Sequence, residues 1–195
     1  FRALLDVQCF DLKAVTSIRE NSRHCEVSAE QYASPGCRSA AVDSLDVAVL
    51  GATEIDTSFH INVHTDSNGS IMGGSGGHSD AAAGSKLALI AAPLFRGRLP
   101  IVRDRVTCIS TPGQDVDVLV TQAGVAVNPK NAELRERLWE ARLPVVDIQE
   151  LKERAERITG TPAPLPVSDR VVAKVISRDG ELLDTIRQAD NRSGV

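Results

Sequence analysis

The sequence has few aromatic residues and no long hydrophobic run. Aromatic residues make up only 3% of the 195 residues, whereas hydrophobic residues make up 42%. This composition favours aliphatic strands packed between helices over an aromatic-rich sandwich. No segment approaches the length of a membrane span, and the N-terminus lacks the charged and apolar regions of a secretory leader. We therefore expect a cytoplasmic protein without a membrane partner.

The chain also has few cysteines, and its basic residues are fewer than its acidic ones. The four cysteines, Cys9, Cys25, Cys37 and Cys108, form no C-x-x-C pair, so we expect reduced core thiols and no zinc or redox motif. The 22 Lys and Arg residues are outnumbered by 26 Asp and Glu residues, which gives a net charge of −4 at pH 7. No basic stripe alternates with aromatic residues, and nucleic acid is therefore not an expected partner.

The strongest positive signal is the stretch GGSGGHSD at residues 73–80. Its glycines let the backbone approach a ligand closely, because they carry no Cβ. A helix that began at Ala81, capped by Ser79 or Asp80, would leave unpaired amides facing an anion or an oxyanion. The alternative is a loop that is only flexible. The residues that we expect to bind substrate are Gly73, Gly74, Gly76, Gly77, Ser79 and Asp80.

The same stretch does not match the common nucleotide-binding motifs. Ser79 stands where a dinucleotide fingerprint has its third glycine, and no acidic residue follows about 20 positions later. The spacing of a P-loop is absent as well, so a nicotinamide-dependent enzyme is disfavoured. His78 lies inside the stretch, where it could donate a hydrogen bond to a carbonyl oxygen or a carboxylate as a catalytic residue, or could only fill the turn.

Other polar residues are candidates with an equally plausible structural role. Asp6 lies within the apolar segment LLDVQCF, where it is either a reactive acid or the acceptor of a structural hydrogen bond. Glu54 and Asp56 follow an expected strand, and we favour a solvated turn over a catalytic role for them. His60 and His64 share an expected strand, but no third ligand has a suitable spacing, so we expect no metal.

Expected strands and helices alternate along the chain, which predicts an open, mostly parallel α/β sheet with helices on both faces. Arg178-Asp-Gly180 predicts a C-terminal antiparallel hairpin between 171–176 and 181–186. The near-continuous apolar run 45–52, interrupted only by Asp46, predicts a strand buried on both faces. The other expected strands are 3–7, 25–28, 60–65 (half-exposed), 87–92, 106–110 and 116–121. The expected helices are 10–20, 29–33, 81–85, 131–141 and 147–158, the last with Ile148, Leu151, Ala155 and Ile158 on one apolar face.

Several long blocks carry a resemblance to a known family. From Phe1 to about Gln188, these blocks read LLDVQCFD, SLDVAVLGATEIDTSFHINV, IMGGSGGHSDAAAGSKLALIAAPLFRGRLP, TPGQDVDVLVT, GVAVNP and SDRVVAKVISRDGELLDTIRQ. In this order they resemble the C-terminal part of the citrate lyase alpha subunit family, the citrate:acyl-carrier-protein transferases. More distantly, VDSLDVAVLGATEID and the glycine stretch resemble the second half of family I CoA transferases, in which an Asp at a helix start matches Asp80.

The resemblance implies a CoA-transferase-like fold and an acyl exchange. Citrate would replace the acetyl group of a thioester on the acyl carrier protein (gamma) subunit, and acetate would leave. The thioester is carried by the CoA-like phosphopantetheine group of that partner, so we expect no cofactor bound directly by this segment. The citryl-ACP lyase (beta) subunit would then release oxaloacetate and regenerate the acetyl carrier. The resemblance thus implies a multienzyme complex and an oligomer.

The chain departs from CoA transferases at the position of their nucleophile. Those enzymes carry a nucleophilic Glu in an S-E-N-G segment where this chain has LLDVQCF. Either Asp6 takes the place of that Glu, or a carboxylate of citrate attacks the thioester directly and forms a mixed anhydride. We favour direct attack, because Val7 rather than Asn-Gly follows Asp6. Amides of the glycine stretch would then stabilise the oxyanion, and nearby Arg or His groups would bind the other carboxylates.

The resemblance also predicts a domain organisation. Residues 1–188 would form the C-terminal CoA-transferase-like domain of a longer chain, and residues 189–195 a disordered tail. The preceding half of that chain would supply a further glycine-rich segment, so we expect the 195 residues alone to be inactive. The alternative to an acyl transferase is a non-catalytic α/β module for assembly or ligand sensing, because a fold alone does not fix a function.

Overall fold

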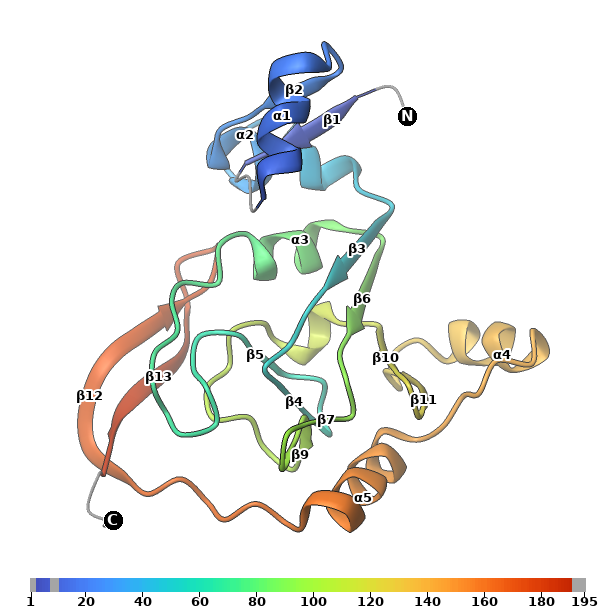
Figure 1. Ribbon diagram of the computed structural model, residues 1–195, viewed down its shortest axis with the longest axis vertical. Helices are drawn as coiled ribbons and strands as arrows, with labels where there is room; N and C mark the ends of the chain where they lie inside the picture. Colours follow the sequence, from blue (N-terminus) through green and yellow to red (C-terminus); the bar gives the residue numbers. More distant parts are fainter. Residues whose placement is uncertain (1–2, 8–10, 191–195) are drawn as a thin grey trace.

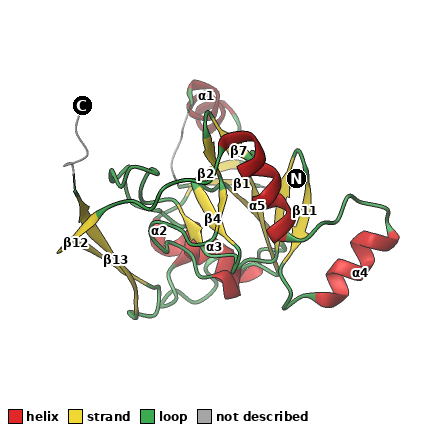
Figure 2. Ribbon diagram, turned by 90° about the horizontal axis from the view of Figure 1, so that it is seen from below, coloured by secondary structure: helices red, strands yellow, loops and turns green. Residues whose placement is uncertain are grey.

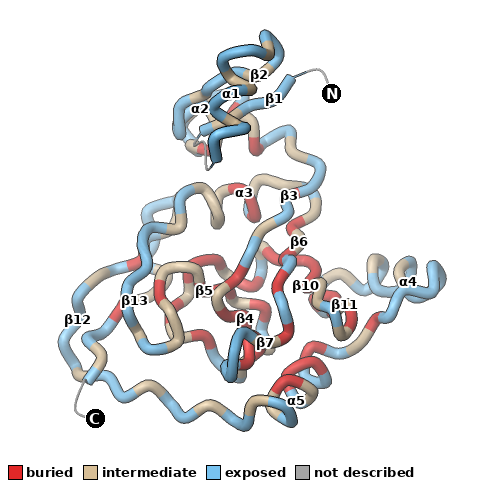
Figure 3. The backbone as a smooth tube through the Cα atoms, viewed as in Figure 1, coloured by how far each residue is buried: buried red, intermediate tan, exposed pale blue. Residues whose placement is uncertain are grey.

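The computed structural model describes residues 3–7 and 11–190, and Figure 1 traces them from a small N-terminal lobe to a long C-terminal hairpin. Most of the buried residues lie in the body below that lobe (Figure 3). Among the described helices, none combines the length and the apolar character needed to cross a membrane. Of the predicted tail, Ala189 still pairs with Val167, whereas residues 191–195 lie outside the described residues.

The N-terminal lobe is a βαβ unit followed by a short helix. Its elements are β1 (Leu4–Asp6), α1 (Leu12–Glu20), β2 (His24–Glu26) and α2 (Ala29–Ala33). The two strands pair in parallel, as a crossover through α1 requires. Asp11 caps α1 by accepting a hydrogen bond from the amide of Ala14, and Ser28 and Gln31 form a capping box at α2. The strands and helices predicted for this region are confirmed.

The central sheet has four strands in the order β11-β10-β6-β3. They are β3 (Val47–Leu50), β6 (Leu87–Ala91), β10 (Val118–Thr121) and β11 (Gly124–Val127). Strands β3, β6 and β10 are parallel, and β11 runs antiparallel to β10. The prediction that β3 is buried on both faces is wrong, because β3 lies at the sheet edge, with Val47 46% and Val49 66% exposed.

A second sheet, in the order β5-β4-β9, forms the centre of the body. It contains β4 (Glu54–Asp56), β5 (Ile61–Asn62) and β9 (Val102–Arg103), and a small hairpin of β7 (Phe95–Arg96) and β8 (Leu99–Pro100) adjoins it. Every residue of β4 and β5 is buried. The half-exposed strand predicted at 60–65 is shorter than expected: only Ile61 and Asn62 are in β5, whereas His60, Val63 and His64 are partly exposed. The side chains Ile55, Phe59 and Ile61 of this region belong to the main hydrophobic core.

The strand predicted at 106–110 is absent from the described structure, although the segment is rich in β-branched residues. The amides of Thr107 and Ile109 donate hydrogen bonds to carboxylates instead of to a neighbouring strand, whereas the amide of Ser110 donates to the carbonyl oxygen of Ile61 in β5. The amide of Thr107 lies 2.7 Å from Oε2 of Glu54, and that of Ile109 lies 2.9 Å from Oδ2 of Asp184. Because the side chains satisfy these amides, the segment needs no ladder partner.

Helices pack on the central sheet and at its margin. They are α3 (His78–Gly84), α4 (Ala132–Glu140) and α5 (Ile148–Thr159), with single 3₁₀ turns η1 (Ala41–Ser44) and η2 (Gly113–Asp115). Helix α3 contacts β3 and β6, whereas α5 contacts β8, β9 and β11. The apolar face predicted for α5 buries Ile148, Leu151 and Ala155, but Ile158 is exposed. Helix α4 projects from the body (Figure 2).

The predicted C-terminal hairpin is confirmed as β12 (Val167–Ile176) and β13 (Leu182–Ala189). Gly180 has φ = 85°, a left-handed conformation suited to glycine in the turn. Cys108, a buried free thiol, packs between Val175 and Ile186 of the hairpin, whereas the thiol of Cys25 is exposed, contrary to prediction. The predicted class, an open α/β fold with a C-terminal hairpin, is confirmed, although the strands are divided among several small sheets.

Candidate functional site

Two regions that the sequence singled out separately meet at one cavity. This cavity, of about 760 Å³, lies between the N-terminal lobe and the glycine-rich loop. One wall contains Asp6 and apolar residues of β1 and α2, and the other contains Gly74, Gly76, Gly77 and Asp80. A volume of this size is typical of small-molecule sites, which span roughly 300 to 1,000 Å³. The fold thus assembles a candidate active site from segments far apart in the sequence.

The glycine-rich loop leads into α3 earlier than the sequence suggested. The helix begins at His78 with Gly77 as its N-cap, so the prediction that Ser79 or Asp80 caps a helix from Ala81 is wrong. The amide of His78 donates to the carbonyl oxygen of Ser75, and that of Ala81 to the carbonyl oxygen of Gly77, which starts the helical turn three residues sooner. Ser79 and Asp80 therefore lie in the first turn, where polar side chains face the loop.

Close approach and backbone conformation both require glycine in this loop. Gly76 has φ = 56°, in the left-handed region that other residues adopt at a cost. A Cβ at Gly77 would lie 2.2 Å from Cε1 of Tyr32, so the loop backbone packs directly against the tyrosine ring. The amides of Gly74, Gly76 and Gly77 donate to no described residue. They remain able to donate hydrogen bonds to a ligand in the cavity.

Tyr32 is a site residue that the sequence analysis missed. It follows the capping box of α2, which places its ring in the wall of the cavity opposite Gly77. Burial raises the pKa of the Tyr32 phenol, and the nearby Asp80 carboxylate raises it further. The signal that was available is that Tyr32 is the single tyrosine of an aromatic-poor chain.

Asp6 and Asp80 bring carboxyl groups to the same cavity. Oδ2 of Asp6 lies 3.5 Å from Nε2 of His24, and the Asp6 side chain is 20% exposed. Burial raises the pKa of the Asp80 carboxyl, and Arg178 opposes that shift. The guanidinium of Arg178, which comes from the turn after β12, also donates to the backbone oxygen of Asp80 at 3.3 Å. The hairpin is thereby linked to the first turn of α3.

His78 does not line this cavity, although its loop does. Its Nε2 lies 2.8 Å from the carbonyl oxygen of Gly51, and its Nδ1 lies 2.8 Å from the hydroxyl of Thr111. Burial lowers the pKa of the imidazole, which favours the neutral form. A neutral ring donates from Nε2 to Gly51 and accepts from Thr111 at Nδ1. Both ring nitrogens are thus engaged in holding the loop, and a catalytic role for His78 remains a prediction.

The other side of the loop borders a second cavity of about 360 Å³. Gly73, Gly74 and Ser79 line it together with residues of the β12–β13 hairpin. His64 and Ser110 also belong to its wall, and Nδ1 of His64 lies 2.6 Å from Oγ of Ser110. All six residues that the sequence predicted to bind substrate therefore line one or both of the two cavities.

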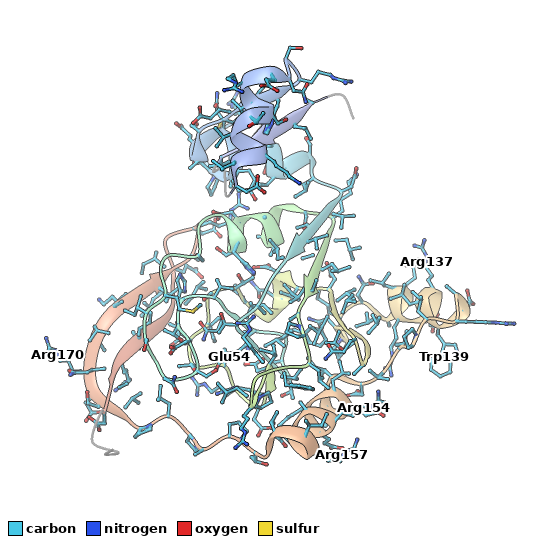
Figure 4. The ribbon with its side chains drawn as sticks, viewed as in Figure 1. Glu54, Arg137, Trp139, Arg154, Arg157 and Arg170 are labelled. Atoms are coloured by element: carbon cyan, nitrogen blue, oxygen red, sulfur yellow. The ribbon has the colours of Figure 1, made fainter. Side chains whose placement is uncertain are left out.

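Glu54 and Asp56 are buried, so the prediction of a solvated turn is wrong. Glu54 is fully buried and lies in the middle of the body (Figure 4), where its Oε1 is 3.0 Å from Nη1 of Arg103. It also accepts hydrogen bonds from Asn62 and Thr107. These contacts make Glu54 part of a structural network, because a buried charge requires such partners. In contrast, the labelled arginines of α4 and β12 point outward from the surface (Figure 4).

No metal centre emerges among the residues that the structure describes. Within them, no group of three or more His, Cys, Asp or Glu side chains is arranged to hold a metal ion. His60, one of the two histidines considered for that role, lies 3.2 Å from Oδ2 of Asp56, and His64 contacts Ser110.

Comparison with known proteins identifies relatives over nearly the whole chain. The model of the family described as "Citrate lyase, alpha subunit (CitF)" matches residues 1–189. The citrate lyase alpha chain of Klebsiella pneumoniae is 50% identical over 190 residues, and that of Escherichia coli strain K12 is 53% identical over 187. These alignments cover 97% and 96% of this chain but 37% of each relative. The chain therefore spans just over a third of the length of these relatives.

A solved structure also matches the fold closely. It is described as the putative alpha subunit of citrate lyase from Streptococcus mutans in complex with citrate. The TM-score is 0.92 and the sequence identity is 42%, over 97% of this chain and 38% of that one. The fold of this chain is thus shared, over nearly its whole length, with part of the Streptococcus mutans protein.

Proposed function

Because this chain belongs to the citrate lyase alpha subunit family, we propose that it forms part of an acyl transferase that exchanges acetyl for citryl on a carrier thioester. The observation that carries the proposal is the cavity of about 760 Å³ in which Asp6 faces the glycine-rich loop. Loop amides without described partners are suited to an oxyanion, and apolar residues beside them are suited to a thioester chain. The substrate would be the acetyl thioester of an acyl carrier protein, and the acyl acceptor would be citrate.

The reaction we propose has two balanced steps. A carboxylate oxygen of citrate attacks the carbonyl carbon of the acetyl thioester, and the C–S bond breaks. The carrier departs as a thiolate, and the product is a citryl–acetyl mixed anhydride. The thiolate then attacks the citryl carbonyl carbon, and acetate departs as the C–O bond breaks. Each step passes through a tetrahedral oxyanion, which the amides of Gly76 and Gly77 would stabilise; their place in the cavity wall and their lack of a described acceptor support this role.

In this mechanism the carboxyl of Asp6 need not form a covalent intermediate. The Asp6 carboxyl lies on β1, beside the imidazole of His24 of β2, in the wall of the cavity opposite the loop. A direct attack by citrate leaves Asp6 unmodified, whereas a double displacement would pass through an acyl–Asp6 anhydride. Treatment with hydroxylamine during turnover, followed by mass spectrometry, distinguishes the two, because an acylated Asp6 becomes a hydroxamate. We expect no hydroxamate at Asp6.

The proposed partners follow from the same reaction. The acyl carrier protein (gamma) would present its thioester on a phosphopantetheine arm, and the citryl-ACP lyase (beta) would consume the citryl thioester in a cytoplasmic complex. The relative from Streptococcus mutans, described as a complex with citrate, supports citrate as the acyl acceptor. The apolar residues Leu5, Val7 and Ala29 of the cavity support binding of the uncharged pantetheine part of that arm.

The decisive experiment uses the complete subunit that contains this segment. The subunit is mixed with acetylated acyl carrier protein and isotope-labelled citrate, and the products are identified by mass spectrometry. We expect a labelled citryl thioester on the carrier and one free acetate for each citryl group. If the carrier keeps its acetyl group while the subunit is folded and assembles with its partners, a role in assembly rather than catalysis would replace the proposal.

A further inference from the structure

We infer that Arg178, in the turn between β12 and β13, is a positioning residue for the candidate active site, where it holds Asp80 and the first turn of α3 against the glycine-rich loop. The contact joins residues 98 positions apart in the sequence. It connects the C-terminal hairpin to the larger cavity, of about 760 Å³, which no described residue of the hairpin lines. The part that Arg178 would play in acyl transfer rests on the proposed function, whereas the contact itself does not.

The guanidinium of Arg178 makes two contacts with the same residue. Its Nη1 donates a hydrogen bond to the backbone oxygen of Asp80 at 3.3 Å, and its Nε lies 3.9 Å from Oδ1 of the Asp80 carboxylate. The side chain of Arg178 is 15% exposed, and that of Asp80 is 24% exposed. A largely buried guanidinium requires such partners, because little water reaches it to replace them. One side chain therefore holds both the backbone and the carboxylate of Asp80.

The turn that carries Arg178 is held by its own hydrogen bonds. Oγ of Ser177 accepts hydrogen bonds from the amides of Asp179 at 3.2 Å and Glu181 at 3.1 Å. The amide of Ser177 donates to the carbonyl oxygen of Glu181 at 2.7 Å, which closes the turn. Figure 1 shows this end of the hairpin beside α3. Because the turn is already ordered, the contact with α3 costs little further backbone entropy.

Through Asp80, the contact reaches the wall of the larger cavity. Asp80 lines that cavity together with Gly76 and Gly77, which lie immediately before α3. His78 holds the start of the same helix through hydrogen bonds at both of its ring nitrogens. Arg178 adds a second point of attachment two residues further along. A displacement at Asp80 would move the adjoining loop amides, and acyl transfer is sensitive to such small displacements.

Arg178 also provides a positive charge next to a wall that is otherwise acidic. The described residues that line the larger cavity include the carboxyl groups of Asp6 and Asp80 but no basic side chain. A carboxylate without a counter-charge would repel an oxyanion formed in the same cavity. Arg178 is not among the described lining residues, so it offsets the charge of Asp80 without taking up the space of a ligand.

The other groups that influence this contact come from several elements. The charged or titratable ones are Tyr32 of α2, Asp115 of η2, Asp179 of the same turn and Lys130 before α4. Burial raises the pKa of Asp115, whereas Lys130 and Arg178 lower it. The ammonium of Lys130 lies 3.2 Å from Oδ1 of Asp117. Among the described residues, Arg178 is therefore the cation that contacts Asp80.

The first test measures acyl transfer by the complete subunit. Arg178→Gln removes the charge, whereas Arg178→Lys keeps it. We expect kcat to fall by at least about tenfold in Arg178→Gln with little change in the KM of citrate, and to recover in part in Arg178→Lys. The matched control is Arg170→Gln, an exposed arginine of β12 that points outward (Figure 4), which should leave kcat unchanged. An unchanged kcat in Arg178→Gln would overturn the inference.

A pH profile distinguishes control of Asp80 from a general loss of stability. Burial raises the pKa of Asp80, Arg178 lowers it and Asp179 raises it. The limb of the kcat/KM profile that reports Asp80 should therefore move to higher pH in Arg178→Gln and to lower pH in Asp179→Asn. The pKa of Asp115 shifts in the same directions, but Asp115 lines neither cavity at the loop. A profile that stays in place in both variants would overturn the inference.

Hydrogen–deuterium exchange separates failure of this inference from failure of the proposed function, because it needs no acyl transfer. We expect peptides that cover residues 73–84 to exchange at least about threefold faster in Arg178→Gln than in wild type, and peptides of α5 to exchange at the same rate in both. If the loop opens in this way in a subunit that transfers no acyl group, the proposed function fails and the inference stands. Equal rates for residues 73–84 in the two proteins overturn the inference even if acyl transfer occurs.

Discussion

The imidazole Nε2 of His78 lies 2.8 Å from the carbonyl oxygen of Gly51, which ties the glycine-rich loop to the segment after β3. The second ring nitrogen contacts the hydroxyl of Thr111, which is fully buried. Three segments of the chain therefore converge on one neutral ring, and the ring fixes the point at which α3 begins. The position of the loop in both cavities depends on this contact.

Replacing His78 should accordingly destabilise the fold. His78→Leu leaves the buried hydroxyl of Thr111 without its partner, which costs about 1 to 3 kcal/mol, and also removes the hydrogen bond to the exposed residue Gly51. We expect the free energy of unfolding, measured by urea denaturation, to fall by about 1 to 3 kcal/mol. His78→Gln, which keeps a donor and an acceptor, should lose less. Equal stability of His78→Leu and wild type would contradict the positioning role.

The same ring should make stability depend on pH. Burial lowers the pKa of His78, and His64 lowers it further, against the opposing effect of the bond to Gly51. The folded state therefore binds fewer protons than the unfolded state, so this stability is fully present above about pH 6.5 and is lost as the pH falls toward the folded pKa. Urea midpoints from about pH 5.5 to 7.5 should show this slope.

The matched variant isolates the histidine in that experiment. Burial raises the pKa of Asp80 and of Asp115, and these shifts change stability with pH in the opposite direction. Both carboxyl groups remain in His78→Gln, so a shallower slope in this variant reports the imidazole alone. An identical slope in the two proteins would assign the pH dependence to other groups.

Much of the fold was predictable because its signals are local. The apolar face of α5, apart from Ile158, and the Asp-Gly turn of the hairpin are set by residues close in sequence, and both are confirmed. Burial was harder to predict. The run 45–52 is apolar in every position but Asp46, yet β3 is an edge strand, because sheet order depends on tertiary contacts.

The sequence indicates several residues of the candidate site but not which of them lie together. The glycine-rich loop and Asp6 stand out as unusual residues, whereas nothing in the sequence indicates that they share a cavity. Glu54 was taken for a solvated acid because its partners, Arg103 and Thr107, lie about fifty positions away. Tyr32 carries no motif at all, and only the packing of α2 against the loop brings it to the cavity.

A methyl group at position 74 should impair acyl transfer without weakening the fold. A Cβ built on Gly74 meets no heavy atom within 4 Å, and the residue lies in the wall of both cavities. We expect Gly74→Ala to lower kcat/KM by at least about tenfold, because a small displacement of the reactants is costly. The urea midpoint should stay unchanged or rise slightly.

The control for that variant is Gly36→Ala. A Cβ at Gly36 would contact only Oγ of Ser34, at 3.8 Å, and the residue lines neither cavity. Both replacements add the same methyl group at a position outside the left-handed region. Full activity in Gly74→Ala would show that substrate does not pass close to the loop.

The buried pair of Glu54 and Arg103 should be important for stability. Glu54→Gln leaves a guanidinium that is only 11% exposed without its counter-charge. Breaking a buried pair from one side costs about 3 to 5 kcal/mol, so we expect a loss of that order in the free energy of unfolding. Asp46→Asn, which removes an exposed partner of Lys86, should leave the urea midpoint unchanged. Similar midpoints for the two variants would show that the Glu54 network contributes little.

Burial should also protect one thiol from alkylation. Burial raises the pKa of Cys108 to about 12, with Asp184 and Glu54 adding to the shift, whereas Cys25 is an exposed free thiol. Because the thiolate is the nucleophile, Cys108 should resist iodoacetamide at about pH 8 while Cys25 reacts, as measured by peptide mass spectrometry. In urea, both should react at similar rates. Comparable labelling of the two thiols in the native protein would mean that the hairpin β12–β13 opens readily, since Val175 and Ile186 cover Cys108 in the closed state.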